Sequence, residues 1–192
     1  MNTLYFITSN KGKVKELQNK LSDLQIEVLQ HDLGYPEPQV SSLEEVAQFG
    51  VKYLQQLGID RPFILEDAGL FIDELKGFPG VYSKYVFTTI GNQGILDLLK
   101  DSQDRTATFQ SVIAYATPQG EPHLFKGECN GTLATSMRGS NGFGYDPLFI
   151  PKNNTQTFAE MTTQQKNTYS HRGKATNNLK QFLQRKKSSH LS

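Results

Sequence analysis

The sequence predicts an α/β fold, a single domain built on a mixed β-sheet with helices around it. Strand-like and helix-like segments alternate in the first third of the chain, two long β-rich segments follow, and the last part is helical. The 192 residues are enough for one domain with a real core but short for two. We therefore expect one domain over residues 1–192, with a mixed sheet and not a regular βαβ array.

The first third is expected to contain three buried strands and two amphipathic helices. Short apolar runs predict the strands at 4–7, 26–29 and 63–65. The third strand is expected to end on Glu66 and Asp67. Apolar residues fall on one helical face over 13–21 and over 43–57, and Gly58 is placed to close the second helix.

The middle of the chain changes to β-hairpin character, and the end is helical. The expected elements are a loop over 78–85, a short helix over 95–99, hairpin strands over 106–116 and 122–129, a glycine-rich loop over 139–144 and a last strand over 148–150. Thr162 and Gln165 form a capping-box pattern. Leu179, Phe182 and Leu183 then predict an amphipathic final helix that ends in a polar tail.

Composition and charge exclude several classes of function. The formal net charge of +1 gives no general attraction to nucleic acid or acidic membranes, so any anion site must be local. The basic residues Arg185, Lys186 and Lys187 are expected to be a solvated helix end and not a nucleic-acid site. A single cysteine, Cys129, excludes an internal disulfide and is expected to be buried. No apolar run reaches the ~18 residues of a membrane span and no leader is recognised, so we expect a cytoplasmic protein.

The junction between the first strand and first helix has the character of a phosphate site. A helix N-terminus there offers backbone N–H groups and the positive end of the helix dipole. Short donors and two lysines surround it: Thr8, Ser9, Asn10, Lys11, Gly12 and Lys13. The spacing is not that of a Walker loop. A plain helix cap with solvated lysines is the alternative.

The acidic pair after the third strand is a candidate metal and catalytic site. Ligand groups are common where strands of α/β folds end. Because neighbouring strand residues point to opposite faces, one of the pair is expected to enter the site. We assign that position to Asp67, as a magnesium ligand that orients water, while Glu66 pairs with a lysine or reaches the metal through water. Glu37 is a candidate second ligand or a solvated loop residue. Lys52 and Lys84 are candidate phosphate contacts or simply exposed.

A third group of residues suits a purine base. Glycines on both sides of Phe143 allow close approach of the backbone and leave its ring free to stack on a purine. Asp146 can accept a hydrogen bond from the base or from a cation, and His171 and Arg172 can donate. Such donors suit a carbonyl at position 6, as in hypoxanthine or xanthine, and leave adenine with unpaired donors at about 1–3 kcal/mol each. Lys166 could contact phosphate or base. A glycine-rich turn beside a basic helix start is the alternative.

Taken together, these segments resemble the inosine/xanthosine triphosphate pyrophosphatase family, which hydrolyses deaminated purine nucleotides such as ITP, dITP and XTP. The resemblance covers nearly the whole chain. It extends to three further motifs, at 76–84, at 158–161 and at 170–172. The segment from Tyr35 to Glu37 and the helix start at 43–47 look like the archaeal and eukaryotic branch.

The resemblance implies an elongated mixed sheet with two lobes around a central cleft, in a homodimer. It implies that Asp67 is the catalytic base and, with Glu37, holds Mg²⁺, for which Mn²⁺ is a candidate substitute. The remaining matched positions are implied to bind the nucleotide: Thr8 to Lys13, Phe143, Gly144, Tyr145, Asp146, Lys166, His171 and Arg172. The chain departs from the family at Ala68, where many relatives carry Ser or Thr, and near Gly50, where the bacterial pattern has a lysine. Lys52 replaces that lysine only if the helix is turned or shifted.

The residues and the resemblance together predict in-line attack of water on the α-phosphorus, with pyrophosphate as the leaving group. Asp67 would deprotonate the water, and Mg²⁺, Lys11 and Lys13 would neutralise charge. Two other functions stay open. One is a Maf-type pyrophosphatase acting on dTTP, UTP or modified pyrimidines, against which Phe143 and the 170–172 segment argue. The other is a purine-nucleotide binder without catalysis.

Overall fold

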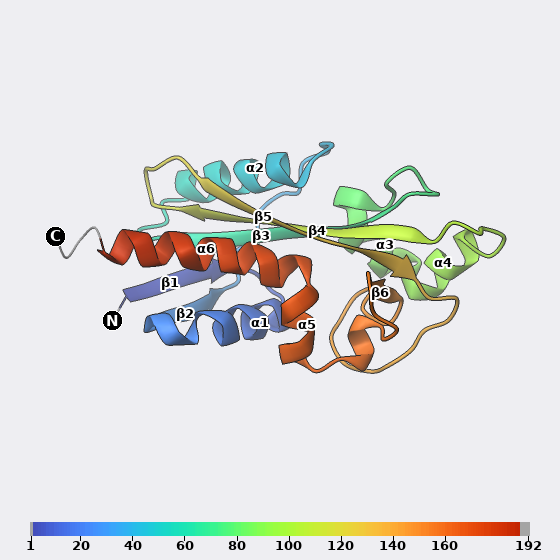
Figure 1. Cartoon of the computed structure of the whole chain (residues 1–192). Coiled ribbons are helices and arrows are strands. Elements are labelled where there is room, and N and C mark those ends of the chain that lie inside the picture. The colour runs from blue at the N-terminus through green and yellow to red at the C-terminus, as the bar shows by residue number, and fades with distance from the viewer. Residues whose placement is uncertain (1, 189–192) are drawn as a thin grey trace.

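The computed structural model describes residues 2–188, and a six-stranded mixed sheet runs through it (Figure 1). The strands are β1 (Asn2–Ile7), β2 (Ile26–His31), β3 (Phe63–Ile72), β4 (Thr106–Ala116), β5 (His123–Leu133) and β6 (Phe149–Pro151). Their order in the sheet is β2-β1-β3-β4-β5-β6. β1 pairs in parallel with β2 and β3, and every later pairing is antiparallel. The predicted mixed sheet is confirmed.

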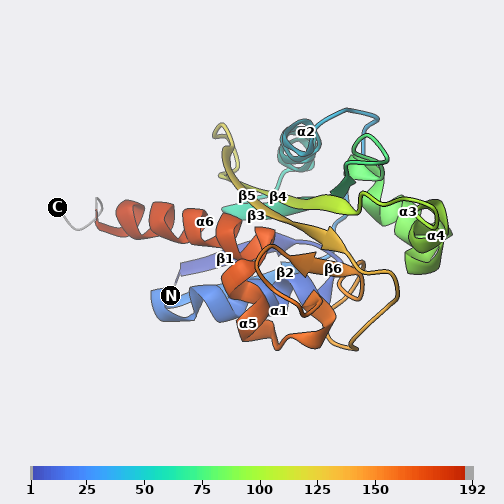
Figure 2. The ribbon, with the colours of Figure 1, turned by 45° about the vertical axis from the view of Figure 1, so that its right-hand side comes forward.

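Helices cover both faces of this sheet. They are α1 (Lys11–Leu21), α2 (Leu43–Gln56), α3 (Ser83–Thr89), α4 (Gly91–Leu98), α5 (Thr163–Tyr169) and α6 (His171–Ser188), with 3₁₀ turns η1 (Ser22–Leu24), η2 (Gly80–Tyr82) and η3 (Phe158–Glu160). Figure 2 shows α2 on one face and α1 with α6 on the other. Two predicted ends are confirmed: Gly58 has a φ of 79°, and Thr162 with Gln165 forms the capping box of α5.

The alternation of side chains along β3 decides what each face receives. Ile64 packs with Leu4 and Leu17 beneath α1 and α6. Phe63 and Leu65 belong to the other cluster, beneath α2. By the same period of two, Glu66 points toward α1 and α6, and Asp67 points toward α2.

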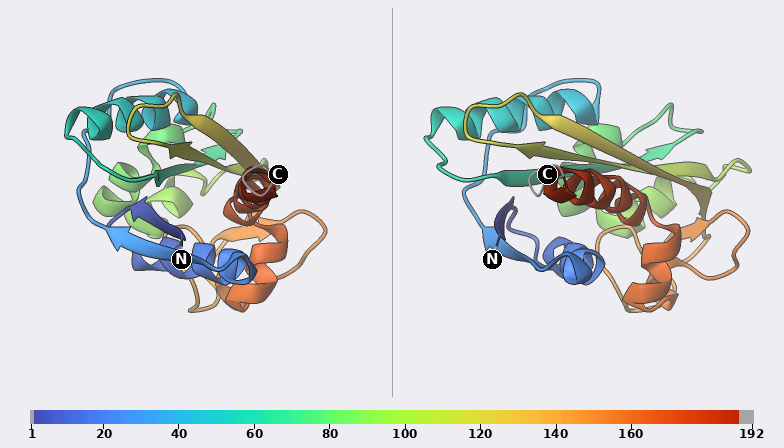
Figure 3. Two further views of the ribbon diagram at one scale, coloured as in Figure 1. Left: turned by 90° about the vertical axis from the view of Figure 1, so that its left-hand side faces the viewer. Right: turned by 60° about the vertical axis from the view of Figure 1, so that its left-hand side comes forward.

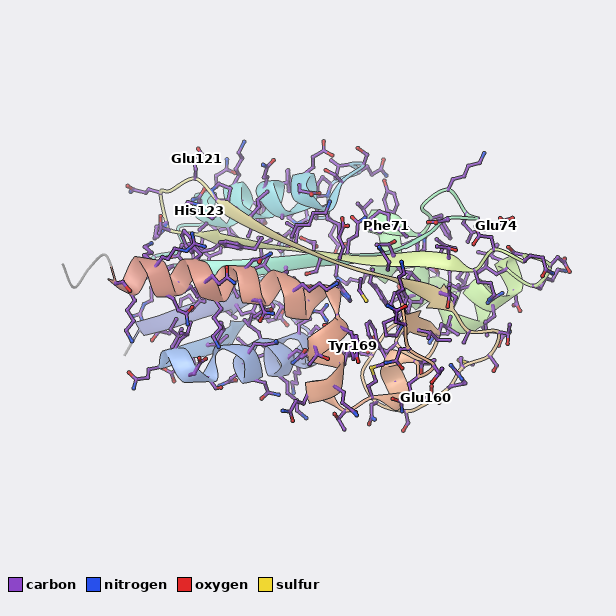
Figure 4. The ribbon with its side chains drawn as sticks, in the orientation of Figure 1. Phe71, Glu74, Glu121, His123, Glu160 and Tyr169 are labelled. Carbon is purple, nitrogen blue, oxygen red and sulfur yellow. The ribbon has the colours of Figure 1, made fainter. Side chains whose placement is uncertain are left out.

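A second core lies at the far end of the long strands. Leu70 and Ile72 of β3 pack there with Ile95 of α4, Phe149 of β6 and Phe158 of η3. The molecule is therefore elongated and has two lobes, as Figures 1 and 3 show. Figure 4 places Glu121 and His123 near one end, at the β4–β5 turn, and Glu74 toward the other. One sheet spans both lobes, as expected if residues 1–192 form a single domain.

Several element boundaries were predicted wrongly. β3 does not end on Glu66 and Asp67. Its parallel pairing with β1 stops at Leu65, but β4 pairs with it along its whole length, from Phe63 to Ile72. The short helix expected over 95–99 is α4, which already starts at Gly91. α3 begins at Ser83, inside the expected loop over 78–85, and β5 extends to Leu133. The polar tail expected after the last helix lies partly outside the described residues, since α6 continues to Ser188.

Two predictions about burial and membranes can be compared with the structure. Cys129 is buried as expected, and burial raises the pKa of its thiol to about 11. Within residues 2–188 no helix has the length and apolar character that a membrane span requires.

Candidate active site

A cavity of about 370 Å³ opens between the two lobes. Its walls come from the β1–α1 loop, the loop before α2, the middle of β3, the start of α3, the loop before β6 and the start of α6. Most of the sequence-predicted site residues line it: Thr8, Ser9, Asn10, Lys13, Glu37, Asp67, Ala68, Lys84, Phe143, Gly144, Tyr145, Asp146, His171 and Arg172. Six separate segments of the sequence therefore share one site.

The β1–α1 junction is a capped helix start. The side chain of Asn10 accepts hydrogen bonds from the backbone N–H groups of Gly12 (2.9 Å) and Lys13 (3.2 Å). The backbone N–H of Asn10 in turn donates to the hydroxyl of Thr8 at 3.1 Å. Two of the N–H groups expected to face a phosphate are thus used by the cap, as the alternative interpretation held. Thr8, Ser9 and Asn10 still line the cavity.

Four of the predicted residues do not line the cavity. Lys11 is exposed on the outer side of α1, beside a separate surface hollow. Gly12 supports the wall, since a Cβ there would lie 2.7 Å from the ring of Phe143. Lys166 is buried behind the wall. Lys52 is exposed on α2, so the structure gives no support to its contact with a phosphate.

The lysine of the bacterial family pattern would fall near Gly50, and in this protein the ring of Tyr35 lies there. A Cβ at Gly50 would lie 2.9 Å from a ring carbon of Tyr35 and 2.9 Å from Leu65. The ring of Tyr35 therefore occupies the room that the glycine of α2 leaves, and Lys52 does not turn toward it.

Glu66 is a structural carboxylate. It accepts from Arg172 Nε at 3.0 Å and from Ser111 Oγ at 2.7 Å, and Lys13 Nζ lies 3.0 Å from its second oxygen. Burial acts to raise the pKa of Glu66, but the charges of Arg172 and Lys13 hold it well below the usual range. The expected pairing of Glu66 with a lysine is confirmed, and an arginine joins it.

Asp67 faces a different environment. Its carboxyl accepts a hydrogen bond from Tyr35 Oη at 2.7 Å and lines the cavity. Burial raises the pKa of Asp67 to about 6, against the opposing effects of Lys13 and of the Tyr35 hydrogen bond. A carboxyl with such a pKa can take up and release a proton near neutral pH, which suits a general base.

In the cavity wall and behind it, charges of opposite sign alternate in a largely buried chain. Lys13 pairs with Glu66, Glu66 with Arg172, and Arg172 with Glu16 through its Nη1 atom. Lys166 continues the chain, with its Nζ atom 2.8 Å from Glu16. It ends at Asp146, which lies 2.7 Å from the same Nζ atom. Because each buried charge has partners of the opposite sign, the chain avoids most of the penalty for an isolated buried charge.

The loop before β6 places an aromatic ring against this chain of ion pairs. Phe143 lies with its ring centroid 4.7 Å from Lys166 Nζ and 5.2 Å from Arg172 Cζ. Its backbone N–H donates to Asp146 at 2.8 Å. Gly142 has a φ of 77°, and a Cβ at that position would collide with the Asp146 carboxyl, so the turn requires glycine. Asp146 therefore accepts from a cation and from the loop backbone.

His171 lines the cavity. Its ring stacks on Phe109 with centroids 4.5 Å apart, and its Nδ1 atom is buried without a hydrogen-bond partner among the described residues. Burial and the nearby charge of Arg172 hold the pKa of His171 well below its usual value, so the imidazole is uncharged at neutral pH. An unpartnered buried nitrogen on a residue that lines a cavity calls for an explanation, and a ligand contact is one.

Arg172 is less available than the sequence suggested. Its Nε and Nη1 atoms donate to Glu66 and Glu16 inside the protein. Of the two predicted donors, His171 is therefore the one with an unpartnered ring nitrogen among the described residues.

The acidic residues of the cavity suit a hard cation. Asp67 and Glu37 both line it, and Glu37 also pairs with Lys84 at 3.0 Å. Between residues 2 and 188, no three His, Cys, Asp or Glu side chains converge as a complete metal site. Magnesium commonly takes one or two protein carboxylates and completes its shell with water and substrate phosphates. The donor set therefore fits a magnesium ion that is held jointly with a nucleotide.

Sequence reasoning missed four residues that shape the site. Tyr35 bonds Asp67, Glu16 joins Arg172 to Lys166, Ser111 bonds Glu66, and Phe109 supports His171. A signal existed for Glu16, an acidic residue next to Leu17 on the buried side of an amphipathic helix, where a charge requires a partner. The other three depend on contacts between distant segments.

These features define a class of protein: a two-lobed α/β protein whose central cleft combines a carboxyl of raised pKa, a candidate magnesium site and a polar aromatic pocket. The sequence profile of the Ham1 family matches residues 4–182, and the chain belongs to this family. It is 53% identical over 180 residues to the dITP/XTP pyrophosphatase of Thermococcus kodakarensis, covering 94% of this chain and 96% of that protein. Identity to the dITP/XTP pyrophosphatase of Pyrococcus horikoshii is 49% over 181 residues, covering 94% and 95%.

Solved structures agree with this family assignment. A HAM1 protein from Coxiella burnetii superimposes with a TM-score of 0.84 at 32% identity, covering 96% of this chain and 100% of that one. The Staphylococcus aureus Ham1 protein gives a TM-score of 0.80 at 30% identity with the same coverage. The predicted family and the two-lobed mixed-sheet fold are thus confirmed.

Proposed function

We propose that this protein hydrolyses the deaminated purine nucleoside triphosphates ITP, dITP and XTP to the monophosphate and pyrophosphate. It thereby keeps them out of DNA and RNA. Likeness to dITP/XTP pyrophosphatases over nearly the whole chain supports the proposal. The observation that carries it is one cavity holding both a carboxyl of raised pKa, Asp67, and an uncharged imidazole with an unpartnered nitrogen, His171.

In the proposed reaction, the oxygen of a water molecule attacks the α-phosphorus, and the bond to the oxygen that bridges to the β-phosphate breaks. Pyrophosphate leaves with the electrons of that bond. Asp67 accepts the proton of the attacking water, because at pH 7 a carboxyl with a pKa of about 6 is mostly ionised and still basic. Magnesium would be held by Asp67 and Glu37 and would supply positive charge to the phosphate oxygens. Lys13 and Lys84 line the same cavity and add to that charge.

The base is selected by Phe143 and His171. The ring of Phe143 offers a stacking surface, and the imidazole of His171 offers one hydrogen bond. With its proton on the nitrogen that faces the base, the uncharged imidazole donates to a carbonyl at position 6 of the purine. The amino group of adenine is a donor at the same place, so ATP leaves two donors facing each other.

We infer that the cofactor is Mg²⁺, with Mn²⁺ as a substitute, and that the enzyme is a homodimer in the cytoplasm. The two carboxylates of the cavity support the metal assignment. The dimer rests on the family resemblance, and the cellular location is proposed with it. Light scattering should give twice the chain mass, and a chelator should abolish turnover.

The experiment that tests the function is pyrophosphate release from ITP, XTP, ATP, GTP and dTTP, with magnesium and with chelator. Magnesium-dependent release from ITP and XTP, with ATP and GTP far slower, is expected. A preference for dTTP would assign the chain the Maf-type activity instead. Binding of ITP without pyrophosphate release on any substrate would make the protein a nucleotide binder and not an enzyme.

A further inference from the structure

The loop before α2 sends one aromatic side chain under that helix. The ring of Tyr35 lies against Gly50 of α2 and Leu65 of β3. Glycine is among the poorest helix formers, and Gly50 stands in the interior of a 14-residue helix. Because a Cβ at this position would press on the Tyr35 ring, Gly50 provides the space in which the ring sits.

The hydroxyl of Tyr35 reaches the carboxyl of Asp67 with a 2.7 Å hydrogen bond. Among residues 2–188, it is the one side chain that makes a hydrogen bond to this carboxyl. A carboxylate turns easily about its last torsion, which has a broad energy profile. A short bond to one oxygen restricts that rotation and settles which oxygen faces the cavity.

We propose that Tyr35 is a positioning residue for the reaction proposed above. Its hydroxyl holds one oxygen of Asp67 so that the other oxygen is directed at the attacking water. Gly50 leaves the space beneath α2 that the Tyr35 ring occupies. The inference rests on the proposed function, and it concerns the orientation of the general base, Asp67, within that site. A base displaced by about 1 Å can lose roughly 100-fold in rate while substrate binding changes little.

The first test is Tyr35→Phe, which keeps the ring and removes only the hydroxyl. We expect kcat for ITP to fall by about tenfold or more, with KM within about twofold of the wild type. Affinity for the non-hydrolysable probe α,β-methylene-ITP, measured by calorimetry, should stay the same. Tyr53→Phe is the matched control, because Tyr53 lies on α2 and does not line the cavity. It should keep wild-type kcat and KM.

The second test changes Gly50, which leaves the space for the Tyr35 ring. Gly50→Ala should lower kcat when Tyr35 is present, because the new methyl group displaces the ring and its hydroxyl. In the Tyr35→Phe background the same change should have no further effect on kcat, since there is no hydroxyl left to displace. Such non-additivity is the signature of two residues that act through one contact.

Two results would overturn the inference while the proposed function stands. The first is wild-type kcat in Tyr35→Phe. The second is a loss of kcat matched by an equal rise in KM, weaker binding of the probe and a lower Tm than in Tyr53→Phe, which would describe a packing residue. If the wild-type protein itself releases no pyrophosphate from any nucleotide, the proposed function fails, and the role of Tyr35 fails with it.

Discussion

Glu66 and Asp67 are neighbours on β3 and have opposite surroundings. Glu66, on the face of α1 and α6, is held by Arg172, Lys13 and Ser111, and its pKa lies well below the usual range. Asp67, on the face of α2, has one neutral donor, Tyr35, and its pKa is raised to about 6. Burial acts on both in the same direction.

The difference shows that burial alone does not set the pKa of a carboxyl. Cations around Glu66 offset its desolvation and keep it charged, so it contributes to the structure of the wall. Asp67 has no ion pair among the described residues, so its desolvation remains largely uncompensated and leaves it able to exchange a proton. The next four predictions test this division of labour, from the largest expected effect to the smallest.

Asp67→Asn should remove the general base and lower kcat for ITP by about 10²–10⁴-fold. The protein should remain folded, because no cation loses its partner. Pyrophosphate release at saturating ITP measures the effect. A variant with more than about a tenth of the wild-type kcat would show that Asp67 is not the base.

Glu66→Gln should instead act on stability. The amide keeps the shape of the side chain but leaves Arg172 and Lys13 with one buried counter-charge fewer, at a cost of about 3–5 kcal/mol. Urea unfolding at pH 7 measures it. Glu27→Gln, at an exposed position of β2, is the matched control and should stay within about 0.5 kcal/mol. Equal effects at both positions would contradict a structural role for Glu66.

The stability of Asp67→Asn should depend on pH in a defined direction. Asp67 has a folded pKa of about 6 and an ordinary value of 3.8, so the folded state binds the proton more tightly than the unfolded state. Tighter proton binding stabilises the folded state below pH 4, and this stabilisation is lost as pH rises through 6. Asparagine cannot ionise, so in metal-free buffer the variant should gain about 2–3 kcal/mol over the wild type at pH 7 and only about 0.5 kcal/mol at pH 4. Unfolding at the two pH values checks the sign, and an equal difference at both would contradict it.

Lys84→Met should have the smallest effect. The Lys84–Glu37 pair is exposed, with 75% and 47% of the two side chains accessible to solvent, in contrast to the buried chain at Glu66. Exposed pairs contribute about 0–1 kcal/mol to stability. Urea unfolding should therefore show a change below about 1 kcal/mol. A loss comparable to that of Glu66→Gln would mean that burial does not separate the two kinds of pair.

Local patterns predicted much of the fold. The strand at 4–7, the helix from Leu43, the turn at Gly58 and the capping box at Thr162 depend on residues close together in the chain, and all four are confirmed. The length of β3 could not be predicted in this way. Two acidic residues interrupt its apolar run, and the partner that continues it, β4, lies further along the chain.

The candidate site divides in the same manner. Chemical type pointed to Asp67, Phe143 and His171, which the structure brings into one cavity. Lys11 and Lys52 carry the expected charge but lie outside it, because their helical positions face solvent. Tyr35 carried no signal, since a tyrosine in a loop acquires a role only through what its hydroxyl reaches.

By itself, the sequence determined the chemical groups that are present, the local elements that carry them and the family to which the chain belongs. The tertiary structure decided which of two adjacent carboxylates is held charged and which is free to exchange a proton. Glu16 and Arg172 lie 156 residues apart in the chain, yet their ion pair helps to determine the field around Glu66. The physical reason is that a pKa depends on burial and on nearby charges, and folding brings both from distant segments.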